Sequence, residues 1–185
     1  MKPQLFSHKS KTPGDLPKWL NTTPYGKPLK REILNKNGEL MKIRIVPFKT
    51  PLSKDLDQFI PEDKRLHPDQ LIKHYQEQNV YLKGQQIPYP QFLNLFNSYM
   101  INFEKQMTQD NEYIGVHCTH GKNRTGLMIV QYLCKVKNIE LDVAFKEFNE
   151  ARAPETLDKE MYLEYLHEQF SYQKNINFDD TKVTL

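Results

Sequence analysis

The fold of this 185-residue chain is decided by ten residues, His117-Cys118-Thr119-His120-Gly121-Lys122-Asn123-Arg124-Thr125-Gly126. A short apolar run, Tyr113 to Val116, precedes them, and an apolar stretch with helical spacing follows from Leu127. A loop that joins a strand to a helix N-terminus turns its backbone N–H groups inward, where they and the helix dipole can hold a phosphate. The segment therefore predicts a strand, phosphate loop and helix unit.

Three side chains of this loop suit phosphoryl chemistry. A cysteine at the start of such a loop has a stabilised thiolate, so the pKa of Cys118 is expected to fall from about 8.5 to between about 3.5 and 7.5. Arg124 can offer a planar fork to two phosphate oxygens, and the Thr125 hydroxyl can donate to the thiolate or assist a second step. Gly121 and Gly126 permit tight backbone curvature. Cys118 is therefore predicted to be a nucleophile at neutral pH.

Composition places the chain among ordinary globular proteins of one domain. It is 38% hydrophobic and 26% charged, and no apolar run approaches the ~20 residues that span a bilayer. No apolar signal segment follows the first residues, so an intracellular location without membrane attachment is expected. The net charge of +3 excludes little. The domain is expected to span residues 16–172, with a mobile leader over 1–15 and a flexible tail over 173–185.

The hydrophobic pattern predicts an α/β domain with a small central sheet flanked by helices. A half-buried strand is expected over Met41 to Phe48, ending near Pro47, with Ile33-Leu34 as its partner across the Asn37-Gly38 turn. Helices are expected from Pro68 toward Gln78, from near Pro90 to Phe103, and over Arg124–Val136, Leu141–Arg152 and Lys159–Phe170.

The two cysteines require separate explanations. If the segment between Cys118 and Cys134 is helical, they stand roughly 24 Å apart, beyond the reach of a disulfide. Cys134 lies beside Leu133 on the apolar helix and is expected to be a packed thiol. His117 and His120 are metal ligands by type, but no partners with ligand spacing accompany them, so no metal site is predicted.

The ten-residue segment resembles the signature loop of the cysteine-dependent phosphatases, H-C-x-x-G-x-x-R-[ST]. Thr119, His120 and Asn123 narrow the resemblance to the RNA 5′-triphosphatases of that superfamily, which include the triphosphatase domain of metazoan-type mRNA capping enzymes and its stand-alone relatives. The resemblance covers most of residues 16–170 and extends to the segments Pro17-Lys18-Trp19-Leu20, Gly26, Phe48-Lys49-Thr50-Pro51-Leu52, Arg65-Leu66-His67-Pro68, Ala151-Arg152-Ala153-Pro154 and Tyr162-Leu163. It implies the fold of a cysteine phosphatase.

This resemblance implies a two-step hydrolysis with no metal or other cofactor. The Cys118 thiolate attacks the γ-phosphorus of a 5′-triphosphate RNA end, and water then hydrolyses the cysteinyl phosphate. Some relatives of this kind also act on 5′-diphosphate ends, so the step at which hydrolysis stops is open. Arg124 and the loop amides from Thr119 onward, with those of His120 and Gly121 among them, are implied to hold the phosphoryl oxygens.

Three further residues receive roles from the same resemblance, and two lysines are considered from their positions alone. His117 is implied to order the loop and tune the thiol, and Asn123 to fix the shape of the loop. Arg152 is a second candidate phosphate contact. Lys122 lies at the rim of the loop, where it either contacts the substrate's next phosphates or is solvated. The same two alternatives stay open for Lys49, which follows the first strand.

The chain departs from the family between Gln78 and Tyr81, where roughly thirty positions are missing, including a strand and an aspartate considered an acid. No residue from Gln78 to Phe103 is acidic. Either the chain is a shortened variant or residues are omitted there, and we favour omission because losing a central strand would expose the core. The terminal phosphate of a diphosphate leaving group has a second pKa of about 6, so it needs little protonation as it leaves. A site without a general acid therefore suits phosphoanhydrides better than phosphotyrosine.

Two other function classes stay open, a dual-specificity protein or lipid phosphatase and a module that only binds phosphate ends. An inactive binding module predicts loss of Cys118 or Arg124, and both are present. No K-x-D-G guanylyltransferase motif occurs. The chain is therefore expected to be an excised capping-enzyme domain or a stand-alone enzyme with a partner such as a guanylyltransferase, in the nucleus or alternatively in the cytoplasm.

Overall fold

The computed structural model describes residues 16–29, 32–77, 81–83 and 93–171, with the backbone alone for 81–83. The predicted leader, residues 1–15, and tail, residues 173–185, lie outside the described residues. The elements are α1 (Leu16–Leu20), β1 (Glu32–Leu34), β2 (Leu40–Lys42), β3 (Ile45–Lys49), the 3-10 helices η2 (Lys54–Phe59) and η3 (Glu62–Lys64), α2 (Pro68–Glu77), β4 (Tyr81–Lys83), α3 (Leu93–Gln106), β5 (Glu112–Cys118), α4 (Asn123–Lys135), α5 (Leu141–Arg152) and α6 (Glu160–Phe170).

The sheet that carries the predicted loop has β5 at its centre. Within the described residues its strand order is β3-β5-β4, and both neighbours run parallel to β5. The register pairs Lys49 with Cys118, so the carboxyl ends of β3 and β5 lie side by side. Loops that follow these strands meet at the same edge, which is where parallel sheets place their ligands.

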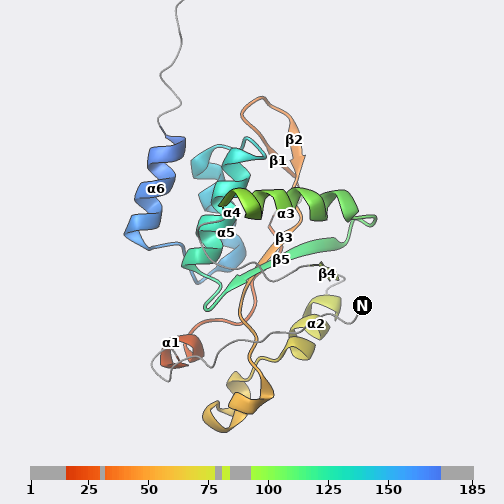
Figure 1. Cartoon of the computed structure of the whole chain (residues 1–185), viewed down its shortest axis with the longest axis vertical. Coiled ribbons are helices and arrows are strands. Elements are labelled where there is room, and N and C mark those ends of the chain that lie inside the picture. The colour runs from red at the N-terminus through yellow and green to blue at the C-terminus, as the bar shows by residue number, and fades with distance from the viewer. Residues whose placement is uncertain (1–15, 30–31, 78–80, 84–92, 172–185) are drawn as a thin grey trace, which may run out of the picture.

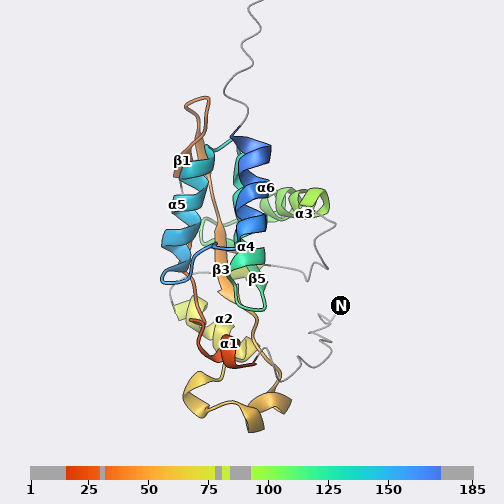
Figure 2. The ribbon, with the colours of Figure 1, turned by 90° about the vertical axis from the view of Figure 1, so that its left-hand side faces the viewer.

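Successive side chains of a strand point to opposite faces of the sheet, so the core is divided into two clusters, one on each face. Ile45 and Ile114 pack with the apolar residues of α3 to α6. Val46, Phe48 and Tyr113 pack with those of α1 and α2. Figures 1 and 2 show α3 to α6 gathered on one side of β5 and α1, α2 and the 3-10 helices toward the other end of the molecule. The prediction of a small sheet flanked by helices is confirmed.

Helix α4 is the centre of the larger cluster. It packs against α3, α5, α6 and β5, and Ile129, Val130 and Leu133 are fully buried. Cys134 on this helix is a buried free thiol whose pKa burial raises to about 12. The prediction of a packed Cys134 is confirmed. None of the described helices is both long and apolar enough to cross a membrane.

The prediction of one strand over Met41 to Phe48 is wrong, because two strands with different partners share this stretch. β2 pairs with β1 in an antiparallel hairpin, with Ile33 opposite Met41, as the Asn37-Gly38 turn predicted. β3 begins at Ile45 and is buried throughout. Pro47 lies within β3 and does not end it, since β3 is an edge strand, where a missing N–H is tolerated.

The connection from α2 to β4 bears on the missing family segment. α2 ends at Glu77 and β4 begins at Tyr81, so only residues 78–80 separate them, and they lie outside the described residues. Because β4 pairs directly with β5, the central strand has a parallel neighbour on each side. The described part of the sheet thus has no gap beside its central strand. The omission of residues between Gln78 and Tyr81 stays a prediction.

The remaining helices agree with the sequence pattern to within a few residues. α5 has the predicted bounds, Leu141–Arg152, and α6 begins one residue later than expected. α4 begins and ends one residue earlier. The described part of the predicted helix from Pro90 is α3, which continues past Phe103 to Gln106, whereas residues 84–92 lie outside the described residues.

Candidate active site

The predicted phosphate loop joins the last residue of β5, Cys118, to the first residue of α4, Asn123. Gly121 turns the loop with a positive φ of 64°. A Cβ at this position would lie 2.3 Å from the carbonyl carbon and oxygen of Phe48. The glycine is therefore required twice, for its backbone conformation and for the close approach of the loop to the end of β3.

Gly121→Ala is expected to abolish most activity, because the new Cβ forces the loop away from β3. A displacement on the order of 1 Å at a catalytic group costs roughly 100-fold in rate. Gly38→Ala is the matched control: Gly38 also has a positive φ, 79°, but no heavy atom lies within 4 Å of its Cβ position. The control should lose about 1–2 kcal/mol of stability and keep its kcat. Equal kinetic losses in both variants would contradict a steric role for Gly121.

Gly126 plays a different part from the predicted one. It lies inside α4, and a Cβ there would come within 2.8 Å of the Phe148 ring and 3.0 Å of the Leu157 Cβ. The residue therefore allows α4 to pack closely against α5 and the segment after it, and it does not curve the loop.

Arg152 supports the loop from beneath, which corrects its prediction as a second phosphate contact. Its side chain is fully buried. Nε donates to the Gly121 carbonyl at 3.0 Å and Nη2 to the His120 carbonyl at 3.0 Å. The remaining donors bind Thr23 Oγ1, Thr23 O and Tyr25 O. A guanidinium has five N–H donors, and these contacts occupy them, so Arg152 holds the loop in shape and leaves substrate contact to others.

Asn123 ties the loop to the segment before α6. Its Oδ1 accepts the N–H groups of Asp158 and Lys159 at 2.9 Å each, and its Nδ2 donates to Asp158 Oδ1 at 2.9 Å. Lys122 Nζ also donates to Asp158, at 2.6 Å, and these hydrogen bonds hold the pKa of Asp158 below its ordinary value. The geometry fits the predicted shape-fixing role of Asn123, and it places Lys122 at the rim in an ion pair with Asp158.

His117 is held by the residue that follows β3. Thr50 Oγ1 donates to the Cys118 carbonyl at 2.8 Å, so it accepts from His117 Nδ1, which lies 3.0 Å away. The imidazole also stacks on Phe48, with ring centroids 5.2 Å apart. Because one hydroxyl bonds both His117 and the Cys118 backbone, the arrangement fits the prediction that His117 orders the loop.

Lys49 is buried and does not line the cavity. Of its two alternatives, substrate contact and solvation, the structure supports neither. The side chain is 2% exposed, and Nζ lies 3.7 Å from the centroid of the Trp19 ring. Nζ donates to the Trp19 and Thr22 carbonyls at 3.1 and 2.7 Å. Lys49 therefore anchors α1 and the turn after it to the end of β3.

The Cys118 thiol lies in surroundings that favour its thiolate. Burial by itself raises the pKa of Cys118, but hydrogen bonds from the Thr125 hydroxyl and from the backbone N–H groups of His120, Thr125 and Lys122 together hold it below the ordinary value. Thr125 Oγ1 is buried and has no other hydrogen-bond partner among the described residues, so its proton is available to the sulfur. This is the environment of a nucleophilic cysteine.

Thr125→Val is expected to raise the pKa of Cys118, since valine keeps the shape of threonine but removes the hydroxyl donor. A raised pKa means less thiolate at a given pH, so the acid limb of kcat/KM should move to higher pH. Thr125→Ser keeps the hydroxyl and should leave the limb in place. The pH dependence of alkylation by iodoacetamide measures the thiolate directly. An unchanged alkylation profile in the valine variant would contradict the role of Thr125.

A cavity of about 330 Å³ opens over the loop. Five residues predicted from the motif line it, namely Cys118, His120, Lys122, Asn123 and Arg124. Arg124 Nη2 donates to Thr119 Oγ1 at 2.9 Å, which holds the guanidinium over the loop. The cavity is large enough for more than one phosphate group.

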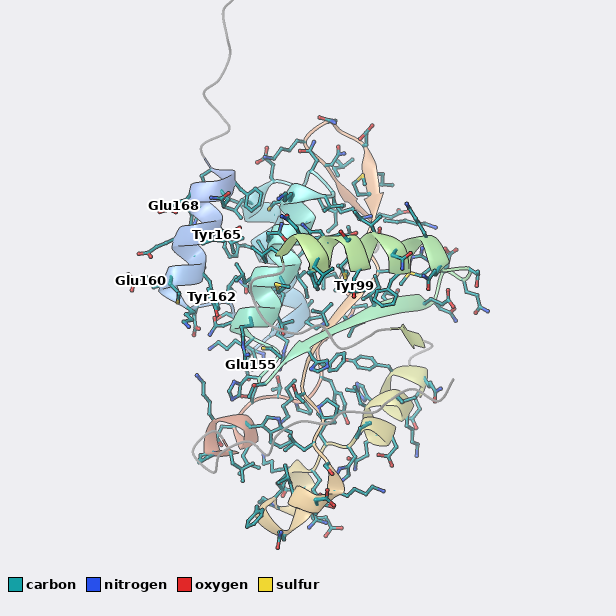
Figure 3. All side chains as sticks on the ribbon, in the orientation of Figure 1. Tyr99, Glu155, Glu160, Tyr162, Tyr165 and Glu168 are labelled. Carbon is teal, nitrogen blue, oxygen red and sulfur yellow. The ribbon has the colours of Figure 1, made fainter. Side chains whose placement is uncertain are left out.

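Six lining residues come from distant segments that the motif does not reach, namely Lys18, Asn21, Thr22, Glu155, Lys159 and Tyr162. Two of them, Lys18 and Tyr162, lie in segments that carry the family resemblance, which is the signal that could have found them. Figure 3 labels Glu155 beside the loop and Tyr162 at the lower end of α6. In the described part of the chain, no group of three or more His, Cys, Asp or Glu side chains is placed to hold a metal ion.

The family model described as "Dual specificity phosphatase, catalytic domain" matches residues 49–171, which include the loop, its cysteine and its arginine. The chain belongs to this family. A dual-specificity phosphatase domain of this kind is a cysteine-dependent phosphohydrolase, and the Cys118 loop is its candidate active-site loop.

Two curated relatives of this dual-specificity phosphatase domain have names that refer to RNA. The "RNA/RNP complex-1-interacting phosphatase" of Homo sapiens is 30% identical over 152 aligned positions, covering 66% of this chain and 46% of the relative. The "mRNA-capping enzyme" of Caenorhabditis elegans is 30% identical over 154 positions, covering 63% of this chain and 24% of that enzyme. The chain thus spans less than half the length of these relatives.

The alignment with the human relative also bears on the missing segment. It runs over 152 positions but takes in 66% of the 185 residues, about 122 residues, so about 30 of its positions are gaps in this chain. This agrees with the number of missing positions expected from the sequence.

Among solved structures, the crystal structure of Tk-PTP in the active form has a TM-score of 0.43 and 18% identity, and the match covers 70% of this chain and 92% of that one.

Proposed function

We propose that this phosphatase domain removes the γ-phosphate from 5′-triphosphate RNA ends. The observation that carries the proposal is the thiolate-stabilising loop of Cys118 and Arg124 at the bottom of a cavity with a lysine-lined wall. The names of two relatives, an mRNA-capping enzyme and an RNA/RNP complex-1-interacting phosphatase, support RNA as the substrate class.

The proposed reaction has two displacements at the γ-phosphorus. Cys118 Sγ attacks this phosphorus, an S–P bond forms, and the bond to the bridging oxygen breaks, so the electron pair leaves with the RNA 5′-diphosphate. Water then attacks the cysteinyl phosphate, phosphate is released, and the thiolate is restored. Arg124 and the loop N–H groups stabilise the charge on the three non-bridging oxygens in both steps.

The scarcity of carboxyl side chains in the described cavity lining favours a phosphoanhydride substrate, whose leaving group needs no general acid. Glu155 is the one carboxylate that lines the cavity within the described residues, and its Oε1 accepts the Thr23 N–H at 3.1 Å. A phenolate with a pKa of about 10 needs a proton as it leaves, whereas a terminal phosphate with a second pKa of about 6 leaves without one. A site whose one carboxylate among the described residues is already engaged by a backbone N–H suits the second leaving group.

The experiment that tests this function compares substrates side by side. RNAs with 5′-triphosphate, 5′-diphosphate and 5′-monophosphate ends and a phosphotyrosine peptide are incubated with the domain, and all products are resolved. We expect the highest kcat/KM on the triphosphate end, with diphosphate as the first product. Faster turnover of the phosphotyrosine peptide would overturn the proposal and favour a protein phosphatase.

The biological setting belongs to the same proposal. A 5′-diphosphate end is the acceptor that a guanylyltransferase needs, so a guanylyltransferase domain or another RNA-processing protein is the partner that we propose. Such a pathway places the domain in the nucleus, with the cytoplasm as the alternative. Whether hydrolysis continues from diphosphate to monophosphate is read from the same product analysis.

A further inference from the structure

Two lysines outside the signature loop face the cavity above Cys118. Lys18 is on α1 and Lys159 is the N-cap residue of α6. Among the described residues neither forms an ion pair within 4 Å, whereas the third lysine of the cavity, Lys122, is 2.6 Å from Asp158. Lys159 Nζ lies 4.7 Å from the centroid of the Tyr162 ring. Two positive charges that form no ion pair within 4 Å among the described residues thus border the cavity, and Lys18 is near enough to Asp158 to help lower the pKa of that carboxyl.

The backbone under both lysines is tied to the loop region. The neighbour of Lys18, Trp19, is fully buried, and its Nε1 donates to the Thr50 carbonyl at 3.1 Å. Thr50 in turn holds the Cys118 carbonyl. On the opposite side, the N–H of Lys159 donates to Asn123 Oδ1 at 2.9 Å. The backbone at Lys18 is therefore connected to the loop through Trp19 and Thr50, and the backbone of Lys159 is bonded directly to Asn123. Backbone that is already held in place loses less entropy when a ligand binds.

We propose that Lys18 and Lys159 form a second phosphate subsite that binds the β- and α-phosphates of a polyphosphate end while the γ-phosphate occupies the Cys118 loop. This proposal rests on the proposed function and deepens it. Both side chains line the cavity that opens over the loop, so they border the space that the phosphates next to the reacting one would enter. A phosphotyrosine ring carries no charge at that place, so the lysines select polyphosphate ends over phosphate monoesters.

The test compares Lys18→Ala, Lys159→Ala and the double variant on two substrates. The readout is the ratio of kcat/KM for 5′-triphosphate RNA to kcat/KM for p-nitrophenyl phosphate. Each substitution is expected to lower this ratio roughly tenfold, the effect of losing one hydrogen bond between charged groups. Lys18→Arg and Lys159→Arg keep the charge and should keep most of the ratio. Lys146→Ala, at an exposed position of α5, is the matched control and should not change it.

The outcomes separate the subsite from the function on which it rests. An unchanged ratio in an enzyme that hydrolyses 5′-triphosphate RNA would overturn the subsite and leave the proposed function intact. No turnover of 5′-triphosphate RNA by the unmodified domain would overturn the proposed function. The subsite is then tested by inhibition of p-nitrophenyl phosphate turnover: tripolyphosphate should inhibit more strongly than orthophosphate, and the double variant should lose this difference. Equal inhibition of the unmodified domain by both anions would contradict the subsite.

Discussion

Replacing Cys118 with serine is expected to lower turnover of 5′-triphosphate RNA by a factor on the order of 10⁴ or more, as removal of the nucleophile does in other covalent enzymes. The serine hydroxyl is close to the thiol in size but stays protonated at neutral pH, so the loop N–H groups have no anion to stabilise before attack. The loop, Arg124 and the cavity remain. Binding of triphosphate ends should therefore persist, and it can be measured by the quenching of a fluorescent RNA end label.

Cys134→Ala is the matched control for this variant, because it removes the other thiol of the chain. Cys134 is buried in α4 and is expected to affect packing alone. The control should keep its kcat and lose roughly 1 kcal/mol of stability or slightly more. Turnover by the Cys118→Ser variant at rates near those of the unmodified domain would contradict a covalent mechanism.

Replacing Arg124 with lysine is expected to lower kcat by roughly 100- to 1000-fold, the cost of removing a positioned donor from a developing oxyanion. Lysine keeps the charge but cannot offer two parallel N–H donors to a phosphate. It also cannot reproduce the guanidinium geometry set by the 2.9 Å contact of Nη2 with Thr119 Oγ1. Steady-state kinetics on 5′-triphosphate RNA would separate the loss in kcat from any rise in KM.

Arg44→Lys provides the comparison for Arg124→Lys. Arg44 precedes β3 and donates to the Gln109 carbonyl at 2.9 Å, well outside the cavity lining. This variant should keep both kinetic constants. If Arg124→Lys raised KM while leaving kcat unchanged, Arg124 would bind the ground state and transition state equally, and its assigned role in the transition state would be wrong.

The parts that the sequence predicted well are those with strong local signals. The signature loop, the helix that follows it and the apolar β5 depend on neighbouring residues, and their positions in the structure agree with the pattern. The Asn37-Gly38 turn likewise predicted the β1–β2 hairpin. Local geometry was enough because each of these features is set by residues within one turn or one strand.

The parts that the sequence missed depend on contacts between distant segments. Arg152 has the chemistry of a phosphate ligand, and only its full burial and its bonds to the His120 and Gly121 carbonyls assign it to the support of the loop. Lys18 lies 100 residues before Cys118 in the chain, and no sequence period could place both in one cavity. The split of Met41 to Phe48 into two strands likewise follows from partners far along the chain.

Acid-quenched labelling determines whether Cys118 carries the γ-phosphate covalently. RNA labelled at either the γ- or the α-phosphate is mixed with the domain in a chelating buffer, quenched in acid, and the labelled residue is located by mass spectrometry. We expect label on Cys118 from the γ-labelled RNA alone and none in the Cys118→Ser variant. Label on another residue, or release of γ-phosphate by Cys118→Ser at the unmodified rate, would contradict this covalent role of Cys118.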